Sequence, residues 1–290
     1  MSPHERRRLV IAVTRPYHGL GNRMRVVFGA KALADSTGRG LRFVWSVGKP
    51  FGARLDQLWE VRDRPLPRLA SRALTARYPY RDEKLAWLDG ATEERVWQIR
   101  TAHALHLPEA AGPWERTLQQ VPPVAGIRDA VTDFHTRDLG RSPYVGVMVR
   151  AHPVSHQETL LASPVEWYIA RLRALRSQHP ALRFFVSADS PEAAARIAQE
   201  VPGCVSLKKT GGYNTRVGLQ EAVTDLYLLA SSSHLVGPHF SSFPELAQRL
   251  AGPGLRLETS RTAPEHDFDP EQLSTPSDPT RPHERQATSL

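Results

Sequence analysis

The chain has 290 residues, of which 40% are hydrophobic and 23% are charged, a composition typical of a globular protein of up to two domains. No stretch reaches the roughly 18 consecutive apolar residues of a membrane-spanning helix, and the apolar run at 9–13 is too short for a signal peptide. The single cysteine, Cys204, excludes an intramolecular disulfide and makes a cysteine metal site implausible. We therefore expect a cytoplasmic protein without membrane insertion.

The net charge of +8 raises the question of a nucleic-acid partner. The 38 Lys and Arg residues are scattered without a block of five or more, which is typical of a solvated surface with a few cations left for a phosphate-bearing small molecule. The chain has no recognisable nucleic-acid-binding motif, so we expect no nucleic-acid partner. The abundance of Arg and Ala favours a bacterial source with a GC-rich genome.

The first predicted elements form a strand–helix–strand unit. Residues 9–14 are an apolar, β-branched run that predicts a buried strand, and apolar residues recur at helical spacing from Asn22 until Gly38 stops the pattern. A second strand is predicted at 41–45. A glycine turn between a strand and a helix, followed by another strand within about 40 residues, is typical of a parallel sheet.

The stretch 50–135 shows weaker patterns. A short helix is predicted at 55–59, and 91–106 is predicted to contain helix. Prolines interrupt 112–124, and the sequence predicts no topology for 60–135.

From residue 144 onward, strands and helices alternate clearly. The predicted strands are 144–149, 183–189, 204–207 and 234–237, and the predicted helices are 164–178, a helix opened by Ser190, 218–232 and 243–250. Ser163 is predicted to be the N-cap of the first of these helices, with Pro164 at its first position.

Two such alternations, divided near 136–142, predict an α/β fold of two facing Rossmann-like domains with a ligand cleft between them. The first domain is expected at 9–138 and the second at 139–260. The tail 261–290 has few apolar residues, so we expect it, like residues 1–8, to be disordered.

The first candidate site is the segment GLGNRMR, which begins at Gly19 between the first strand and its helix. Glycines let the backbone approach a ligand closely, and the helix N-terminus offers free N–H groups to a phosphate. Arg23 adds a guanidinium that suits phosphate geometry. The alternative is that the glycines serve only a tight turn, and Met24 stands where the dinucleotide-binding fingerprint has its third glycine.

The second candidate is Arg150, which directly follows the apolar strand at 144–149. Because strand ends in open α/β sheets face the ligand crevice, Arg150 is predicted to reach a diphosphate. The alternative is that it pairs with a surface acid.

The third candidate lies between 218 and 250. Asp225 interrupts an otherwise apolar helix and is either an exposed residue or a buried hydrogen-bond acceptor for a ligand. Sixteen positions later, Ser241, Ser242 and Phe243 stand between a strand and a helix, where hydroxyl and N–H groups suit a phosphate. An ordinary serine N-cap is the alternative.

Together, these motifs resemble those of the superfamily of α1,6-fucosyltransferases, nodulation fucosyltransferases and protein O-fucosyltransferases. GLGNRMR resembles their opening loop, MVRAHP resembles their H-x-R strand end, and the spacing from Asp225 to the SSF motif matches theirs. The resemblance covers about residues 9–251.

The resemblance implies a GT-B architecture and an inverting transfer that needs no metal and no cofactor, with a GDP-sugar as donor. It implies that Arg150 binds the β-phosphate and assists departure of the diphosphate, and that Asp225 contacts guanine. Ser241 and Ser242 match a phosphate-binding pair. The loop that closes over the sugar-phosphate matches Gly21 and Asn22.

The general base is less well defined. Glu158 approximately matches an acidic position proposed for that role in the α1,6 enzymes, and His152 and His156 are alternatives. Two positions depart from the family pattern: Met148 replaces a histidine that contacts the nucleotide, and Ala151 replaces the second arginine of the α1,6 enzymes.

We therefore predict a glycosyltransferase that moves fucose or a related hexose from a GDP-sugar donor to a small-molecule, glycan or peptide acceptor that the sequence does not identify. The two departures motivate one alternative, a nucleotide-binding protein with weak or no transfer activity. A transferase that uses a different nucleotide sugar is the other.

Overall fold

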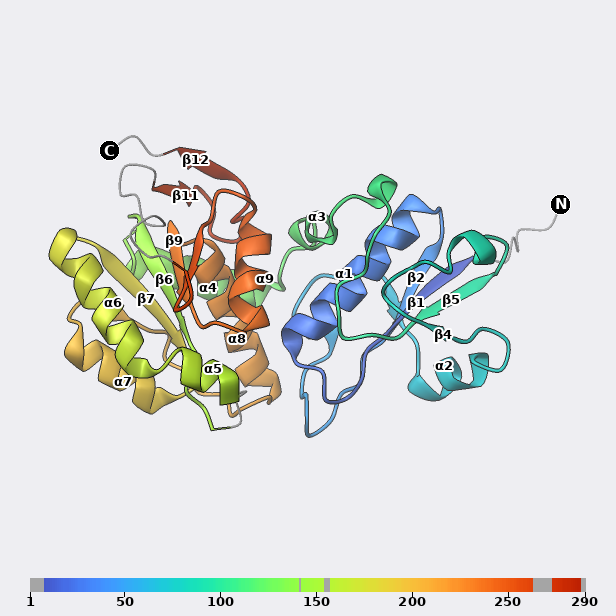
Figure 1. Cartoon of the computed structure of the whole chain (residues 1–290), viewed down its shortest axis with the longest axis horizontal. Helices are drawn as coiled ribbons and strands as arrows, with labels where there is room; N and C mark the ends of the chain where they lie inside the picture. Colours follow the sequence, from blue (N-terminus) through green and yellow to red (C-terminus); the bar gives the residue numbers. More distant parts are fainter. Residues whose placement is uncertain (1–7, 141, 154–156, 263–272, 288–290) are drawn as a thin grey trace. The chain divides into compact units, whose positions relative to one another are not determined.

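The computed structural model describes residues 8–140, 142–153, 157–262 and 273–287. The chain divides into two compact units (Figure 1). We call residues up to Pro122 together with Gly211–Leu219 the N-terminal unit, and Pro123–Thr210 together with the chain from Gln220 onward the C-terminal unit.

The N-terminal unit is built on a five-stranded parallel sheet in the order β3-β2-β1-β5-β4. Its strands are β1 (Leu9–Val13), β2 (Gly40–Val44), β3 (Arg64–Pro65), β4 (Tyr80–Arg81) and β5 (Val96–Ile99). Its helices are α1 (Leu20–Ser36), α2 (Arg68–Leu74) and α3 (Trp114–Gln119), with 3-10 turns at Leu55–Gln57, Asp89–Ala91 and Glu109–Ala111. The α8 helix (Arg216–Ala230) also begins in this unit.

The centre of this sheet follows the sequence pattern closely. β1 is apolar along its length because both of its faces are covered: Ile11 and Val13 pack with Leu74 of α2 in one cluster, and α1 contacts the strand as well. The α1 helix ends as predicted near Gly38, whose φ of 63° is the left-handed conformation that glycine adopts without strain.

The prediction of helix within 91–106 was wrong over residues 96–99. Val96–Ile99 forms β5 and pairs in parallel with β1, with Leu9 opposite Val96. A four-residue apolar stretch fits either a strand or part of a helix, so the choice was made by its pairing partner, which lies far away in the sequence.

The C-terminal unit contains a second five-stranded parallel sheet in the order β10-β9-β6-β7-β8. Its strands are β6 (Tyr144–Val149), β7 (Arg183–Ala188), β8 (Cys204–Val205), β9 (His234–Gly237) and β10 (Leu257–Thr259). Its helices are α4 (Ala125–Arg137), α5 (Gln157–Ala162), α6 (Val165–Gln178), α7 (Pro191–Glu200), the rest of α8, and α9 (Ser242–Ala251). Within the described ranges, no helix combines the length and apolar character required to cross a membrane.

Alternation along the strands divides this unit into three layers (Figure 1). Phe184 and Val186 of β7 belong to the apolar cluster formed with α6 and α7. Phe185 points to the other face and meets Phe134 of α4, with ring centroids 5.4 Å apart. Because α4 packs here, the boundary between units falls at 122–123 rather than at the predicted 136–142.

The structure also differs from the predicted disorder of the tail over residues 273–287. β11 (Ser274–Pro276) and β12 (Arg285–Ala287) form an antiparallel ribbon. The Arg285 guanidinium donates to the carbonyls of Ser232 (2.9 Å) and Ala230, at the end of α8, and its burial lowers the pKa to about 10. Polar hydrogen bonds to helix-end carbonyls anchor this segment, and apolar periodicity cannot predict such contacts. Residues 1–7, 263–272 and 288–290 lie outside the described residues.

A buried carboxylate on β10 joins this strand to β9 and to α6. Glu258 is fully buried, and Arg171 donates to its two carboxylate oxygens at 2.5 and 2.8 Å. His234 Nε2 lies 3.1 Å from Oε2 of the same carboxylate. Although burial opposes the charged form, the hydrogen bonds from His234 and Arg171 hold the pKa of Glu258 below its usual value.

We predict that Arg171→Met lowers the free energy of unfolding by about 3–5 kcal/mol, because it leaves the buried Glu258 carboxylate without its main partner. Arg173→Met is the matched control: it lies on the same helix, and its pair with Glu200 is exposed, so the change should stay below about 1 kcal/mol. Urea denaturation measures both. Equal, small effects would contradict this account.

Candidate functional site

The carboxyl ends of all five strands meet at one edge of the C-terminal sheet. From the central β6, the chain adds β7 and β8 on one side and β9 and β10 on the other, so β6 and β9 flank the point where the strand order reverses. Ligands of open α/β sheets bind outside the strand ends at this switch point. The segments after β6 and β9, which contain Arg150 and Ser241, are the predicted ones.

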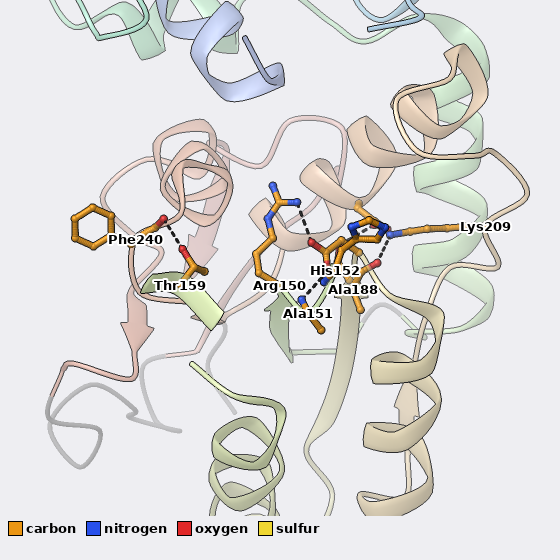
Figure 2. Close-up of polar contacts among 10 residues, drawn as sticks. Arg150, Ala151, His152, Thr159, Ala188, Lys209 and Phe240 are labelled. Atoms are coloured by element: carbon orange, nitrogen blue, oxygen red, sulfur yellow. Dashed lines mark hydrogen bonds and ion pairs between the residues drawn. The ribbon is translucent and has the colours of Figure 1, made fainter. Parts of the chain in front are cut away.

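Arg150 lies at this edge beside an acid that follows the neighbouring strand (Figure 2). The register places Val149 opposite Ala188, so Arg150 and Asp189 come next on adjacent strands. Arg150 Nη1 lies 3.1 Å from Asp189 Oδ2, and the other oxygen of Asp189 accepts from the N–H groups of Ala151 (2.7 Å) and His152 (2.9 Å).

This geometry is compatible with both interpretations of Arg150, pairing with an acid and binding of a diphosphate. The guanidinium is paired with an acid, as the alternative predicted, but the acid is only 10% exposed and also binds the strand-end backbone. The arginine side chain stays 29% exposed, so donors remain for an anion outside the sheet. Asp189 therefore holds a partly exposed cation in a defined orientation at the switch point.

The segments after β6, β9 and β10 are fastened to one another. Thr159 of α5 donates to the carbonyl of Phe240 at 3.1 Å (Figure 2). The prediction that Ser163 is the N-cap of α6 was wrong, because the helix is capped by Pro164. The Ser163 hydroxyl instead accepts a hydrogen bond from His239 N–H (3.0 Å) and shares another with the Ser260 hydroxyl (2.9 Å).

Phe240 is strained and exposed. Its φ is 61°, a region that non-glycine residues rarely adopt, and its side chain is 63% exposed. Such conformations persist where the surrounding contacts impose them and they gather at functional sites. Here the conformation of Phe240 sets the direction in which the chain enters α9.

Ser241 and Ser242 begin α9 as predicted. Ser241 is the N-cap, but its side chain makes no capping hydrogen bond, so the hydroxyl is not used in the way the N-cap alternative requires. The first-turn N–H groups of a helix have no intrahelical acceptor; here Ser242 and Phe243 supply such groups for an anion, Pro244 has none, and Glu245 adds an acid to the same turn. The Phe243 side chain is buried, so any ligand contact there is limited to its backbone.

Asp225 is buried rather than exposed, and its partners are protein groups. The side chain is 1% exposed; Oδ2 accepts from Ser187 Oγ at 2.7 Å and lies 2.7 Å from Lys209 Nζ. Burial raises the pKa of Asp225, and Lys209 opposes that shift. Oδ2 thus anchors Lys209, while Oδ1 is buried without a partner among the described residues, so the guanine contact that the resemblance implies stays a prediction.

The candidate bases have different positions. Glu158 is the second residue of α5 and is exposed, whereas His152 is half-buried at the end of β6. His156 lies outside the described residues. In the described part of the chain, no three His, Cys, Asp or Glu side chains gather in a way that could hold a metal ion.

The GLGN segment opens α1 in the N-terminal unit. Gly19 is the N-cap, with φ −68° and ψ 172°, and no described atom lies within 4 Å of the place that a Cβ would occupy. Neither the backbone angles nor the packing requires glycine there, so the tight-turn alternative does not explain it. Gly21 is buried and Asn22 is half-buried in the first turn of α1, which contains no acidic residue.

Arg23 is fully buried, and its guanidinium is bound by the protein itself. Its guanidinium donates to the carbonyls of His18 (2.8 Å), Ser46 (2.8 Å) and Pro16 (3.0 Å). It also lies 4.0 Å from the ring centroid of Phe51, and burial lowers its pKa to about 10. Because the side chain is fully buried, direct phosphate binding would require the surrounding chain to move. Arg23 holds the segment before GLGN in place.

Asp189 and Lys209 were missed as site residues. Asp189 is the last residue of the strand predicted at 183–189, and since a parallel register sets neighbouring strand ends side by side, its pairing with Arg150 was open to prediction. Lys209 carried no such signal, because it reaches Asp225 from an irregular segment after β8.

Neither a protein-family model nor a curated protein sequence matches the chain. Among solved structures, it is similar to NodZ α-1,6-fucosyltransferase soaked with GDP-fucose, an enzyme of Bradyrhizobium, at 19% identity and a TM-score of 0.60 over 84% of this chain and 93% of that one. POFUT1 in complex with GDP has 14% identity and a TM-score of 0.58, covering 88% and 99%. Arabidopsis thaliana FUT1 in complex with GDP has 15% identity and a TM-score of 0.57, covering 89% and 71%. The chain has the fold of these fucosyltransferases.

We predict that Arg23→Met lowers the free energy of unfolding by at least about 3 kcal/mol, because three carbonyls lose a shared buried donor. Lys31→Met on the same helix removes a surface pair with Asp35 and a longer, partly exposed pair with Asp63, and should cost about 1 kcal/mol or less. Chemical denaturation compares them. A fully stable Arg23→Met protein that has lost anion binding would instead support the predicted role of Arg23 as a phosphate ligand.

Proposed function

We propose that this chain is a glycosyltransferase that moves a sugar, fucose or a related hexose, from a GDP-sugar to a small-molecule, glycan or peptide acceptor. The observation that supports this most is the position of Arg150: a partly exposed guanidinium, oriented by Asp189, at the switch point of a sheet whose fold is shared with fucosyltransferases. Solved structures of those enzymes contain GDP or GDP-fucose. In this proposal, the C-terminal unit binds the donor.

The chemistry requires stabilisation of a leaving diphosphate. As the bond from the anomeric carbon to the phosphate oxygen breaks, negative charge grows on the diphosphate and the sugar becomes oxocarbenium-like. Fixed donors aimed at that growing charge lower the barrier. Arg150 supplies a charged donor and the first-turn N–H groups of α9 supply neutral ones. These donors support a transfer that does not depend on a metal.

We assign a supporting role to the N-terminal unit. In a GT-B arrangement, with two Rossmann-like domains facing a cleft, its GLGN segment closes over the sugar-phosphate and its loops contact the acceptor. The open N-terminus of α1 and the unconstrained Gly19 support this role.

For inversion, the acceptor hydroxyl attacks the anomeric carbon from the face opposite the diphosphate, and a base takes its proton. Glu158 is our first candidate because its carboxylate is exposed and therefore available to an acceptor. His152 is the second.

A binding protein without turnover is the second candidate function. Met148, which replaces the histidine that contacts the nucleotide in the family, is buried within β6, and one oxygen of Asp225 is engaged by Lys209, which favours weaker nucleotide contacts than the resemblance implies.

Two assays separate these possibilities. Thermal shifts with GDP, UDP and dTDP identify the nucleotide, since a ligand that binds the native state raises its melting temperature. GDP release from GDP-fucose, with water alone and with a panel of glycan, peptide and small-molecule acceptors, then reports transfer. Binding without release would favour the second candidate, and no shift with any nucleotide would overturn the donor site.

We predict that Arg150→Ala lowers the rate of GDP release by at least about a hundredfold, the scale of a lost transition-state donor, with little change in melting temperature. Arg173→Ala, which removes an exposed arginine elsewhere in the C-terminal unit, is the control and should leave the rate unchanged. Full activity or global unfolding of Arg150→Ala would refute the role assigned to Arg150.

We predict that Asp189→Asn lowers the same rate on the order of tenfold, because the Asn amide no longer holds the guanidinium. If Asp189 acts through Arg150, the double variant Asp189→Asn/Arg150→Ala should be no slower than Arg150→Ala alone. Multiplied losses in the double variant would show that Asp189 acts independently of Arg150.

A further inference from the structure

Lys209 brings a second cation to the strand-end edge of the C-terminal sheet. It lies in the segment after β8, and its side chain reaches the end of β7 (Figure 2). Nζ donates to the carbonyl of Ala188 at 2.8 Å and lies 2.7 Å from Asp225 Oδ2. Because the mechanism assigned to Arg150 does not use this cation, its role needs a separate explanation.

The Lys209 ammonium has donor capacity left. An ammonium carries three N–H groups, and Ala188 and Asp225 engage two of them. The side chain is 35% exposed, although the carboxylate that anchors it is 1% exposed. One N–H is therefore left for a further acceptor, on an ammonium whose position is set by two short contacts and whose side chain is partly exposed.

The position of Lys209 indicates which part of a bound nucleotide it can contact. A diphosphate bound by Arg150 lies at the β6–β9 switch point, and the rest of the molecule must extend along the edge. Lys209 stands at the end of β7, one strand further along from β6 on the side away from β9. This is where a base can lie when the diphosphate is at Arg150.

We propose that Lys209 donates a hydrogen bond to the base of the donor nucleotide and selects bases that carry a carbonyl oxygen where adenine and cytosine carry an amino group. This inference rests on the proposed function. Guanine O6 and uracil O4 accept hydrogen bonds, whereas adenine N6 and cytosine N4 are donors. Since an ammonium has no acceptor, it satisfies the first pair and opposes the second.

The test is isothermal titration of the full chain with GDP, UDP, ADP and CDP. Lys209→Met should weaken the binding of GDP, or of whichever carbonyl-bearing nucleotide the wild type prefers, roughly ten- to hundredfold, the size of a lost charge-assisted hydrogen bond. The affinities for ADP and CDP should change by less than about threefold. Lys208→Met removes the same charge from the adjacent exposed residue, and should leave all four affinities unchanged.

A second comparison guards against misfolding. Lys209→Met leaves the Asp225 carboxylate buried without its cation, which itself destabilises the fold. Asp225→Asn and the double variant Asp225→Asn/Lys209→Met both avoid a buried charge, and their melting temperatures confirm folding. The ratio of the GDP and ADP affinities is then compared between Asp225→Asn and the double variant. A smaller ratio in the double variant is the effect of Lys209 itself.

The outcomes are distinct. Loss of preference for GDP or UDP in the Lys209 variants supports the inference. Unchanged affinities, or equal losses for all four nucleotides, overturn base selection while wild-type GDP binding still supports the proposed function. A wild-type protein that binds none of the four overturns both.

Discussion

The parallel pairing of β6 with β7 is the constraint on which the candidate site depends. It places Val149 opposite Ala188, so the next residue on each strand, Arg150 and Asp189, meet at the same edge of the sheet. The remaining strands of the sheet are parallel too, so the segments after β8, β9 and β10 arrive at that edge. A cation, an anchoring acid and a helix N-terminus therefore gather in one place because of sheet geometry, before any contact with a ligand.

Buried charge is the second theme of the fold. Arg23, Asp225 and Glu258 are each almost or fully inaccessible; carbonyls satisfy Arg23 and charged partners satisfy Glu258, whereas Asp225 is paired through Oδ2 and its Oδ1 has no partner among the described residues. Removing a charge from water is costly unless partners replace the solvent, so these side chains are committed to the protein. Two of them, Arg23 and Asp225, have the residue types of ligand contacts, and their burial makes them positioning groups: Arg23 holds the segment before GLGN, and Asp225 holds Lys209.

The functional proposal combines this geometry with a fold shared with fucosyltransferases. Three accessible groups at the edge can donate hydrogen bonds: Arg150, the backbone at the start of α9, and Lys209. Arg150 is anchored beside the switch point and Lys209 is anchored further along the edge. This arrangement suits a nucleoside diphosphate whose phosphates lie at Arg150 and whose base lies at Lys209. The departure at Met148 makes the identity of the nucleobase a property of this chain rather than of the fold, and Ala151 separates the chain from the α1,6 enzymes.

The elements with local signals follow from the amino-acid pattern alone. Apolar runs, helical spacing and glycine stops predicted β1, α1, β2 and the alternation from β6 to α9, and a strand end predicted where Arg150 lies, because these patterns arise from neighbours along the chain. Only the tertiary structure decided that 96–99 is a strand, that 274–287 folds back through Arg285, and that Arg23 and Asp225 are buried. Those outcomes depend on partners distant in sequence, such as Ser187 for Asp225 and Ala230 for Arg285. A side chain's type states what it can bind, but its solvent access is set by whatever the rest of the chain packs against it.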